Sequence, residues 1–373
     1  MRILIDYRPA LRERTGVGQY VHELAAALQR QLLPSDRLVL FSSSWKDRLQ
    51  PDRIPGAAHV DARIPVKALN FSWHRLEWPP VEMIAGSADI AHSLHPLLMP
   101  TRDAAQAVTI HDLDFLDHPG RTRAEIRRDY PALAAAHATR ADLVIVNSRY
   151  TASSVASRLG VRADRLVVCR PGAPSDLAPR DTPSAIGPIL FVGTIEPRKN
   201  LPALFSAYEE LVRIRPDAPD LLLAGKVVEH SASILAAVES HPVLARRVRH
   251  LGYVSDAERH ALYREASMLV LPSLDEGFGL TALEAMHVGV PVVASNRGAL
   301  PEVLGNAGQL VDPLKPDAIT AAIIRLLDHP GLRAEQTQAG RDRARQFSWA
   351  ESAGRLIDAY RQTLAQRRAG VPC

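Results

Sequence analysis

The chain has 373 residues, of which 46% are hydrophobic and 23% are charged, and it contains no low-complexity tract. This composition excludes a disordered arm or a fibrous protein, and the length favours two folded domains. Because the net charge is only +4 and basic residues are dispersed among acidic ones, the charge pattern does not favour nucleic acid as a partner.

The chain opens with MRILIDYRP, which is too short in its apolar run for a signal peptide and lacks a small-residue cleavage site, so we expect a first β-strand there. Short apolar runs then alternate with longer amphipathic segments, which is typical of buried parallel strands connected by helices. The expected strands are RILI, RLVLF, ADIAH, AVTIH and DLVIVN, at residues 2–5, 37–41, 88–92, 107–111 and 142–147. The expected helices span residues 18–31, 71–84, 123–139 and 149–158.

A segment crowded with Pro, Gly, Ser and Asp, residues 170–188, predicts a linker between two domains, with the boundary near 175–187. Ser348 is the expected N-cap of a last helix. The fold class is therefore α/β, with two Rossmann-like parallel sheets in an N-terminal domain, residues 1–180, and a C-terminal domain, residues 187–348. The second domain has expected strands at 188–193, 220–225, 247–252, 268–273 and 291–295, and helical patterns follow at 316–327, 332–347 and 349–368.

The stretch LDEGFGLTALEAMHVGVP, residues 274–291, leads from one expected strand into a helix. In parallel α/β domains ligands collect at such strand ends, and the absence of Cβ atoms at Gly277 and Gly279 lets an anion approach the backbone. Glu276 and Glu284 would repel a phosphate but suit sugar hydroxyls, so the pattern indicates a nucleotide sugar. The alternative is an ordinary first helical turn with both glutamates in solvent.

The sequence EGFGLTALEAM…GVPVVAS resembles the E-x7-E signature of the large retaining glycosyltransferase family 4, although Thr281 stands where many members have Pro. The resemblance covers nearly the whole chain. It implies the GT-B architecture, with two Rossmann-like domains facing a cleft and helix 349–368 crossing back to the first domain. It also implies a donor bound mainly by the second domain, an acceptor bound mainly by the first, retention of anomeric configuration, and no metal or other cofactor.

The string GTIEPRKN, residues 193–200, places Arg198 and Lys199 in another loop between a strand and a helix. An Arg binds a diphosphate through a bidentate fork and a Lys as a point charge, although a solvated pair is the commoner outcome. The string resembles the family segment that holds the donor diphosphate. Some members carry the Arg directly after the glycine, where this chain has Thr194.

Further segments resemble parts of the family's site. Gly16 and Gly18 fit a dinucleotide fingerprint poorly. They resemble the glycine loop over the donor phosphate, with a simple turn at the start of a helix as the alternative. His111 in HDLDFLDHP resembles the histidine that reaches the transferred sugar, with Asp112 in support. The resemblance implies His111, Glu276, Arg198 and Lys199 as catalytic residues. The implied donor-binding residues are Gly16, Gly18, Arg198, Lys199, Val254, Glu276, Gly277, Phe278, Gly279, Leu280 and Glu284.

The segments TIEPRKN and HDLDFLDHP look most like those of bacterial enzymes that transfer mannose from GDP-mannose, or a related deoxyhexose, during polysaccharide assembly. The expected acceptor is a saccharide or a lipid-linked saccharide. A UDP-sugar or dTDP-sugar as donor, a nucleotide-sugar epimerase on the same architecture, and a non-catalytic sugar-nucleotide sensor stay open as alternatives.

Two cysteines, Cys169 and Cys373, can build neither a disulfide framework nor a cysteine-based metal site. No run of about 18 apolar residues is present, so we expect a cytoplasmic protein without a membrane span. In residues 67–80, which alternate basic and aromatic residues, Trp73 and Trp78 either pack into the first domain or form an interfacial surface at the inner face of the membrane. The Arg-rich residues 121–130 form either a solvated helix face or a docking patch for anionic lipid or phosphate.

Overall fold

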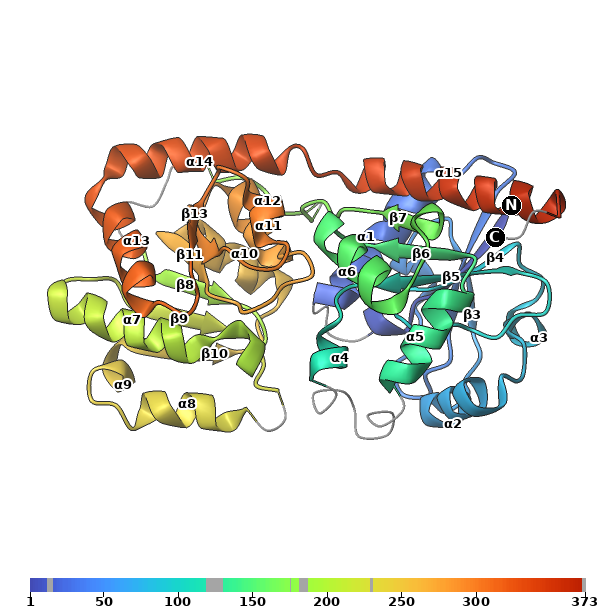
Figure 1. Cartoon of the computed structure of the whole chain (residues 1–373), viewed down its shortest axis with the longest axis horizontal. Helices are drawn as coiled ribbons and strands as arrows, with labels where there is room; N and C mark the ends of the chain where they lie inside the picture. The colour runs from blue at the N-terminus through green and yellow to red at the C-terminus, as the bar shows by residue number, and fades with distance from the viewer. Residues whose placement is uncertain (12–15, 119–129, 175, 181–186, 229–230, 371–373) are drawn as a thin grey trace. The chain divides into compact units, whose positions relative to one another are not determined.

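The computed structural model describes residues 1–11, 16–118, 130–174, 176–180, 187–228 and 231–370 (Figure 1). The chain forms two compact units, one of Met1–Pro171 with Ser348–Cys373 and the other of Gly172–Phe347. The units divide between Pro171 and Gly172. Residues 175 and 181–186 of the expected linker, and residues 121–129 of the Arg-rich stretch, lie outside the described residues.

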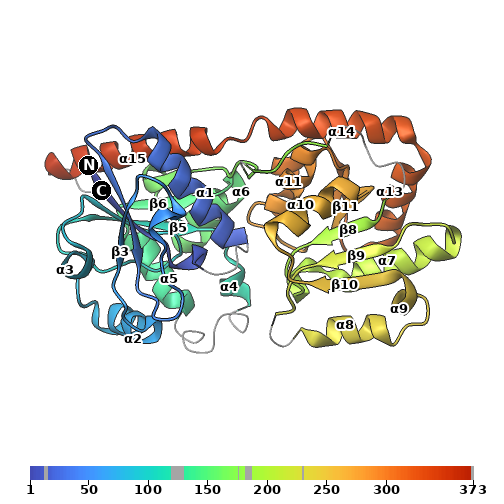
Figure 2. The same cartoon turned by 180° about the vertical axis from the view of Figure 1, so that it is seen from behind.

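Within its described residues, the first unit contains a seven-stranded parallel sheet in the order β3-β2-β1-β4-β5-β6-β7 (Figure 2). The order reverses between β1 and β4, so the loops after these two strands lie side by side. The five expected strands are present. The strands are β1 (Arg2–Asp6), β2 (Arg37–Ser42), β3 (Ala58–Asp61), β4 (Ile90–Ser93), β5 (Ala105–Ile110), β6 (Leu143–Val146) and β7 (Leu166–Val168).

The expected helix over residues 71–84 is wrong. The first helical stretch ends at Leu76, Glu77 adopts a left-handed conformation with φ of 50°, and two prolines that cannot donate a backbone hydrogen bond follow before a separate short helix begins at Val81. The expected helix at 123–139 is described only from Tyr130. The helices of this unit are α1 (Gly16–Gln31), α2 (Val66–Phe71) with a π-helical turn (Ser72–Leu76), α3 (Val81–Ala85), α4 (Asp114–Asp117), α5 (Tyr130–Arg140), α6 (Arg149–Leu159) and α15 (Trp349–Arg368).

Helix α15, the last in the sequence, packs against α1 of the first unit. The hydroxyl of Ser348 accepts hydrogen bonds from the backbone N–H groups of Ala350 and Glu351, which confirms it as the N-cap. The Tyr360 hydroxyl lies 2.6 Å from Nδ1 of the fully buried His92. Helix α15 thus completes the polar and apolar interior of the first unit.

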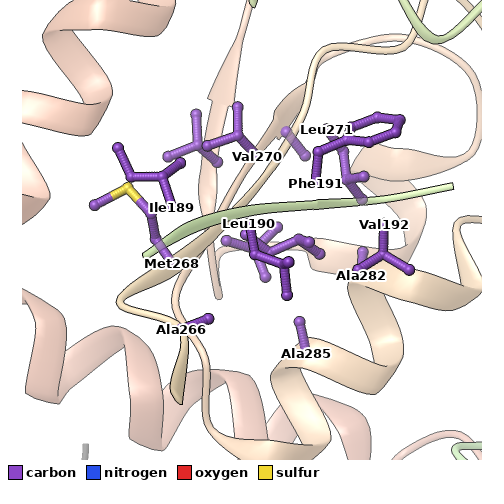
Figure 3. Packing of buried hydrophobic residues seen from close by; sticks show 14 of the residues in the cluster. Ile189, Leu190, Phe191, Val192, Ala266, Met268, Val270, Leu271, Ala282 and Ala285 are labelled. Atoms are coloured by element: carbon purple, nitrogen blue, oxygen red, sulfur yellow. The ribbon is translucent and has the colours of Figure 1, made fainter. Parts of the chain in front are cut away.

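The second unit has a six-stranded parallel sheet among its described residues, in the order β10-β9-β8-β11-β12-β13, which reverses between β8 and β11. Side chains of these two central strands form the core with Ala282 and Ala285 from α11 (Figure 3). The strands are β8 (Ile189–Val192), β9 (Leu221–Ala224), β10 (Val248–Gly252), β11 (Met268–Leu271), β12 (Val292–Ser295) and β13 (Gln309–Val311). The helices are α7 (Leu201–Ile214), α8 (Ala232–Glu239), α9 (Leu244–Arg247), α10 (Asp256–Glu265), α11 (Leu280–Val288), α12 (Leu300–Leu304), α13 (Pro316–Asp328) and α14 (Pro330–Ala344).

None of the helices in the described part of the chain combines the length and the apolar character that crossing a bilayer requires.

Candidate active site

The candidate site lies at the reversal of strand order in the second unit. Parallel α/β sheets bind ligands at this point because the loops after the two central strands diverge there. The loop after β8 carries Arg198 and Lys199, and the loop after β11 carries Glu276. The two loops are joined directly, since the backbone N–H of Leu274 donates to the carbonyl of Arg198 at 2.8 Å.

Glu276 is buried and lies against two cations. Nζ of Lys199 donates to Oε1 of Glu276 at 2.6 Å, and the Ser273 hydroxyl donates to the same oxygen at 2.8 Å. Nη1 of Arg198 lies 3.8 Å from Oε2 of Glu276. Burial by itself raises the pKa of Glu276, but the charges of Lys199 and Arg198 and the hydrogen bonds outweigh it and lower that pKa below its ordinary value. Glu276 is therefore an ionised hydrogen-bond acceptor.

Arg198 lies in a short 3-10 turn, Pro197–Lys199, that precedes α7. Its Nη2 donates to Oε1 of Glu196 at 3.1 Å, and its Nη1 donates to the carbonyl of Asp275 at 3.4 Å. The guanidinium is thus oriented from both loops. The structure brings together Arg198, Lys199 and Glu276, which the sequence analysis assigned to one site.

Gly298 allows the backbone of a neighbouring loop to pack closely against the backbone of Glu276. A Cβ at Gly298, whose φ is +63°, would lie 2.6 Å from the backbone N and 2.7 Å from the backbone O of Glu276. The same carbonyl accepts a hydrogen bond from the Ala299 N–H at 2.8 Å. Gly298 and Ser273 therefore shape the site, although no motif in the sequence marks either of them as functional.

The first turn of α11 follows the loop. Gly279 caps α11 with a φ of 99°, and a Cβ there would lie 2.6 Å from Leu300 Cδ2. The side chain of Phe278 is buried in the core against Phe347, with ring centroids 5.7 Å apart, so Phe278 can meet a ligand only through its backbone. Gly277 is buried and Leu280 half-buried.

Glu284 is buried on α11 and is held by two residues of α10. The Tyr263 hydroxyl donates to Oε2 of Glu284 at 2.9 Å, and Nε of Arg259 lies 3.3 Å from the same oxygen. Burial raises the pKa of Glu284 above its ordinary value, and the charge of Arg259 and the bond from Tyr263 only partly oppose this. Val254 is half-buried just before the Ser255 capping box of α10. Arg259 and Tyr263 could not be recognised from the sequence, because they lie on a separate helix without a motif.

In the first unit, His111 follows β5. Its Nε2 lies 3.2 Å from the carbonyl of Leu94, and its ring packs edge-on against Tyr20 at 4.8 Å. Burial lowers the pKa of His111, so the ring is neutral, and its carbonyl partner assigns the proton to Nε2. Asp112 accepts a hydrogen bond from the backbone N–H of Asp114. Gly16 and Gly18 lie in the first turn of α1, whereas residues 12–15 of their loop lie outside the described residues.

The strand-order reversal of the first unit carries a second polar cluster, which the sequence analysis did not identify. Asp6, fully buried at the end of β1, pairs with Arg8 at 2.5 Å and with Nε2 of His95 at 3.0 Å. Burial raises the pKa of Asp6, but Arg8 and His95 outweigh it and hold this pKa far below its ordinary value. His92 bonds Tyr360 and Thr109 in the interior and is structural.

Comparison with known proteins assigns this arrangement to a family. A family model described as Glycosyltransferase Family 4 matches residues 14–177, and one described as Glycosyl transferases group 1 matches residues 187–329. O-antigen chain mannosyltransferase B of Escherichia coli is 30% identical over 97% of this chain and 100% of its own length. The chain belongs to the family 4, group 1 glycosyltransferases. A serotype-specific mannosyltransferase of Escherichia coli is 33% identical to this glycosyltransferase over 47% of the chain and 22% of its own length.

Solved structures share the fold of this glycosyltransferase. Sucrose-phosphate synthase from Thermosynechococcus elongatus aligns with a TM-score of 0.77 at 22% identity, covering 98% of this chain and 99% of that protein. Anabaena HepE in complex with UDP and glucose aligns with a TM-score of 0.72 at 18% identity, covering 97% of this chain and 100% of that protein. The glycosyltransferase therefore has the GT-B fold, with two Rossmann-like units and a C-terminal helix that returns to the first.

Proposed function

We propose that this glycosyltransferase transfers mannose from GDP-mannose, with retention of anomeric configuration, to a saccharide or lipid-linked saccharide acceptor in bacterial polysaccharide assembly. The observation that carries the proposal is the cluster of Arg198, Lys199 and Glu276 at the strand-order reversal of the second unit. The similarity to an Escherichia coli mannosyltransferase over almost the whole chain supports the choice of sugar.

The two cations would act on the donor diphosphate. When the bond between the anomeric carbon and the diphosphate breaks, negative charge grows on the leaving group. Arg198, Lys199 and the backbone N–H groups at residues 277–280 would stabilise that charge most strongly in the transition state. We propose that no divalent metal is required, because these groups supply the positive charge. Transfer that stopped in EDTA and resumed with added Mg²⁺ or Mn²⁺ would contradict this.

The two glutamates would bind the hydroxylated ends of the donor. Glu276 is ionised and accepts hydrogen bonds, which suits the hydroxyl groups of the transferred sugar. Glu284 has Oε2 anchored by Tyr263 and Arg259, while its Oε1 makes no hydrogen bond to a described residue. We assign that oxygen to the ribose hydroxyls. In the first unit, Nε2 of neutral His111 donates to the Leu94 carbonyl, so Nδ1 would accept a hydrogen bond from a hydroxyl group of the transferred sugar.

In the proposed mechanism the anomeric configuration is retained because the acceptor attacks the anomeric carbon from the same face that the leaving group departs. The acceptor oxygen forms a bond to the anomeric carbon as the bond from that carbon to the diphosphate oxygen breaks. The acceptor hydroxyl's proton passes to an oxygen of the departing diphosphate, so that GDP and the glycoside are the products. Glu276 is assigned to sugar hydroxyls rather than to nucleophilic attack, because Lys199 and Ser273 already hold its Oε1.

The first test is thermal stabilisation of the purified protein by GDP, UDP, dTDP and ADP, because a ligand that binds only the folded state raises the melting temperature. Stabilisation by GDP alone supports the mannose donor. Selective stabilisation by UDP or dTDP would replace that donor with another nucleotide sugar. Stabilisation by none of them would contradict the assignment of Arg198, Lys199 and Glu284.

Product analysis with GDP-mannose then separates transfer from the alternatives. Incubation with acceptor is expected to give a mannoside of unchanged anomeric configuration, and incubation without acceptor is expected to leave the sugar stereochemistry unaltered. An epimerised nucleotide sugar formed without acceptor would indicate an epimerase. Binding without any product would indicate a sugar-nucleotide sensor.

A further inference from the structure

The two residues that hold Glu284 both meet the same oxygen of its carboxylate. Arg259 and Tyr263 lie one turn apart on α10, which packs against α11 (Figures 1 and 2). The Tyr263 hydroxyl is 2.9 Å and Nε of Arg259 is 3.3 Å from Oε2 of Glu284. Because both contacts converge on Oε2, they restrict rotation of the carboxylate and fix the direction in which Oε1 faces.

Arg259 is buried, and stability alone explains its position poorly. The residue is 8% exposed. Its Nη1 lies 3.0 Å from Oδ1 of Asp256, whereas Nε and Nη2 find no hydrogen-bond acceptor in the part of the chain that the structure describes. A buried ion pair contributes little net stability, because the loss of hydration offsets the attraction between the charges. Buried N–H groups without an acceptor add a further cost. The effect of Arg259 on Glu284 accounts for its position better.

The charge of Arg259 favours the ionised form of Glu284. Burial raises the pKa of Glu284, and the carboxylates of Asp256 and Asp176 raise it further, whereas the charge of Arg259 lowers it. Without Arg259, burial and like charges would both favour the protonated form. An ionised carboxylate accepts a hydrogen bond from a hydroxyl group more strongly than a protonated one does. Arg259 therefore strengthens a hydrogen bond that Oε1 accepts from a ligand.

We propose that Arg259 is a positioning residue for the donor ribose, which holds Oε2 of Glu284 so that Oε1 accepts a hydrogen bond from a ribose hydroxyl. The inference rests on the proposed binding of ribose hydroxyls by Glu284. Arg259 acts through Glu284 and makes the site select ribonucleotides over deoxynucleotides. A nucleotide that lacks the bonded hydroxyl leaves the ionised Oε1 without a donor, which costs affinity.

The test compares the affinities of the full-length protein for GDP, 2′-deoxy-GDP and 3′-deoxy-GDP by calorimetry. The parent should bind GDP about 10- to 100-fold more tightly than the analogue that lacks the bonded hydroxyl, the range for a hydrogen bond to a charged group. Arg259→Met should reduce this preference to about 2- to 10-fold, the range for uncharged groups. If UDP is the nucleotide that stabilises the protein, the same comparison uses UDP and its two deoxy analogues.

The preference is a ratio of two affinities for one folded protein, so a general loss of stability does not change it. Arg259→Lys keeps a positive charge and should retain part of the preference. Arg264→Met, at an exposed arginine of α10, is the matched control and should show the parent's preference. Glu284→Gln should lose the preference, and adding Arg259→Met to it should lower the preference no further, because Arg259 acts through Glu284.

The outcomes separate this inference from the proposed ribose contact. A parent-like preference in Arg259→Met, together with its loss in Glu284→Gln, would overturn the role of Arg259 and leave ribose binding by Glu284 intact. Equal affinity of the parent for all three nucleotides would contradict both the ribose contact and the role of Arg259. If Arg259→Met does not fold, Arg259→Gln takes its place, with the same expected loss of preference, because glutamine keeps a polar group but no charge.

Discussion

Lys199 and Glu276 lie 77 residues apart in the chain, yet Nζ of the lysine is 2.6 Å from Oε1 of the glutamate. The contact joins the loops after the two central strands of the second unit, where the strand order reverses. It pairs the residue proposed to hold the diphosphate with the residue proposed to hold the sugar. Variants of each residue, and of both together, can therefore test the two proposed roles.

Glu276→Gln should lower the rate of sugar transfer by about 10²- to 10³-fold, in the range found for loss of one transition-state contact. Glutamine keeps the shape but cannot act as an ionised acceptor for sugar hydroxyls. The affinity for GDP, measured by calorimetry, should change little because GDP lacks the transferred mannose that Glu276 is proposed to bind. Glu210→Gln, at an exposed ion pair on α7, is the control and should transfer normally. Normal transfer by Glu276→Gln would disprove the assignment.

Lys199→Met should weaken the binding of GDP by about 10- to 100-fold, the range for a hydrogen bond to a charged group. It also leaves Glu276 without its closest cation, which by itself costs stability. The double variant Lys199→Met/Glu276→Gln removes that second effect. It should recover part of the melting temperature but none of the GDP affinity. Lys315→Met, at an exposed lysine of the same unit, should bind GDP normally; recovery of GDP affinity in the double variant would contradict a phosphate contact.

Gly298→Ala should lower the free energy of unfolding by about 1–3 kcal/mol, because the new methyl group meets the Glu276 backbone and the φ of Gly298 is +63°. Gly331→Ala is the matched control, since a Cβ there meets no atom within 4 Å. Urea unfolding should show the control unchanged or slightly more stable. Equal stability of the two variants would mean that the loop of Gly298 relaxes without cost.

The stability of the first unit should fall in acid because of His92. Burial lowers the pKa of His92 from 6.5 to about 3, so the folded protein keeps the ring neutral while the unfolded chain takes up a proton near the ordinary value. The unfolded state thus binds more protons between these two pKa values, and the free energy of unfolding decreases as the pH falls through that window.

His92→Gln removes this titration. The variant should be less stable at neutral pH, because the bond to Tyr360 changes, but its stability should vary less with pH between 6.5 and about 3. Denaturant unfolding at several pH values measures both effects. His118→Gln, at an exposed histidine, should keep the parent's pH dependence. If the plots of unfolding free energy against pH are parallel for the parent and His92→Gln, groups other than His92 dominate the pH dependence of stability.

Central strands could be predicted from the sequence because burial on both faces produces a continuous apolar run. The three strands that were missed, β3, β7 and β13, all lie at sheet edges, are at least partly exposed and are only three or four residues long. The failed helix at 71–84 has the amphipathic composition of a helix. The helix is interrupted at Glu77 and the two prolines that follow, so these local breaking residues outweigh the helical spacing of the apolar residues.

The site was predictable where the residues fall in loops between strands and helices, as Arg198, Lys199 and Glu276 do. Their mutual pairing was not, because it depends on β8 lying next to β11, and the order of strands in a sheet is a long-range property. Ser273, Gly298, Arg259 and Tyr263 act on the glutamates through packing that a linear motif does not record. That Trp73 is buried and Trp78 is exposed likewise depends on the tertiary fold and could not be predicted from the sequence.

The return of α15 to the first unit also sets an order on biosynthesis. A ribosome makes the strands of the first unit early, but it adds Tyr360 and Ser352 only after the whole second unit has been translated. Until then His92 lacks its bond to Tyr360, and the carbonyl of Arg170 lacks its bond from Ser352. The unit that is translated first is therefore completed last, and its unfinished surface must stay protected from aggregation while the second unit emerges.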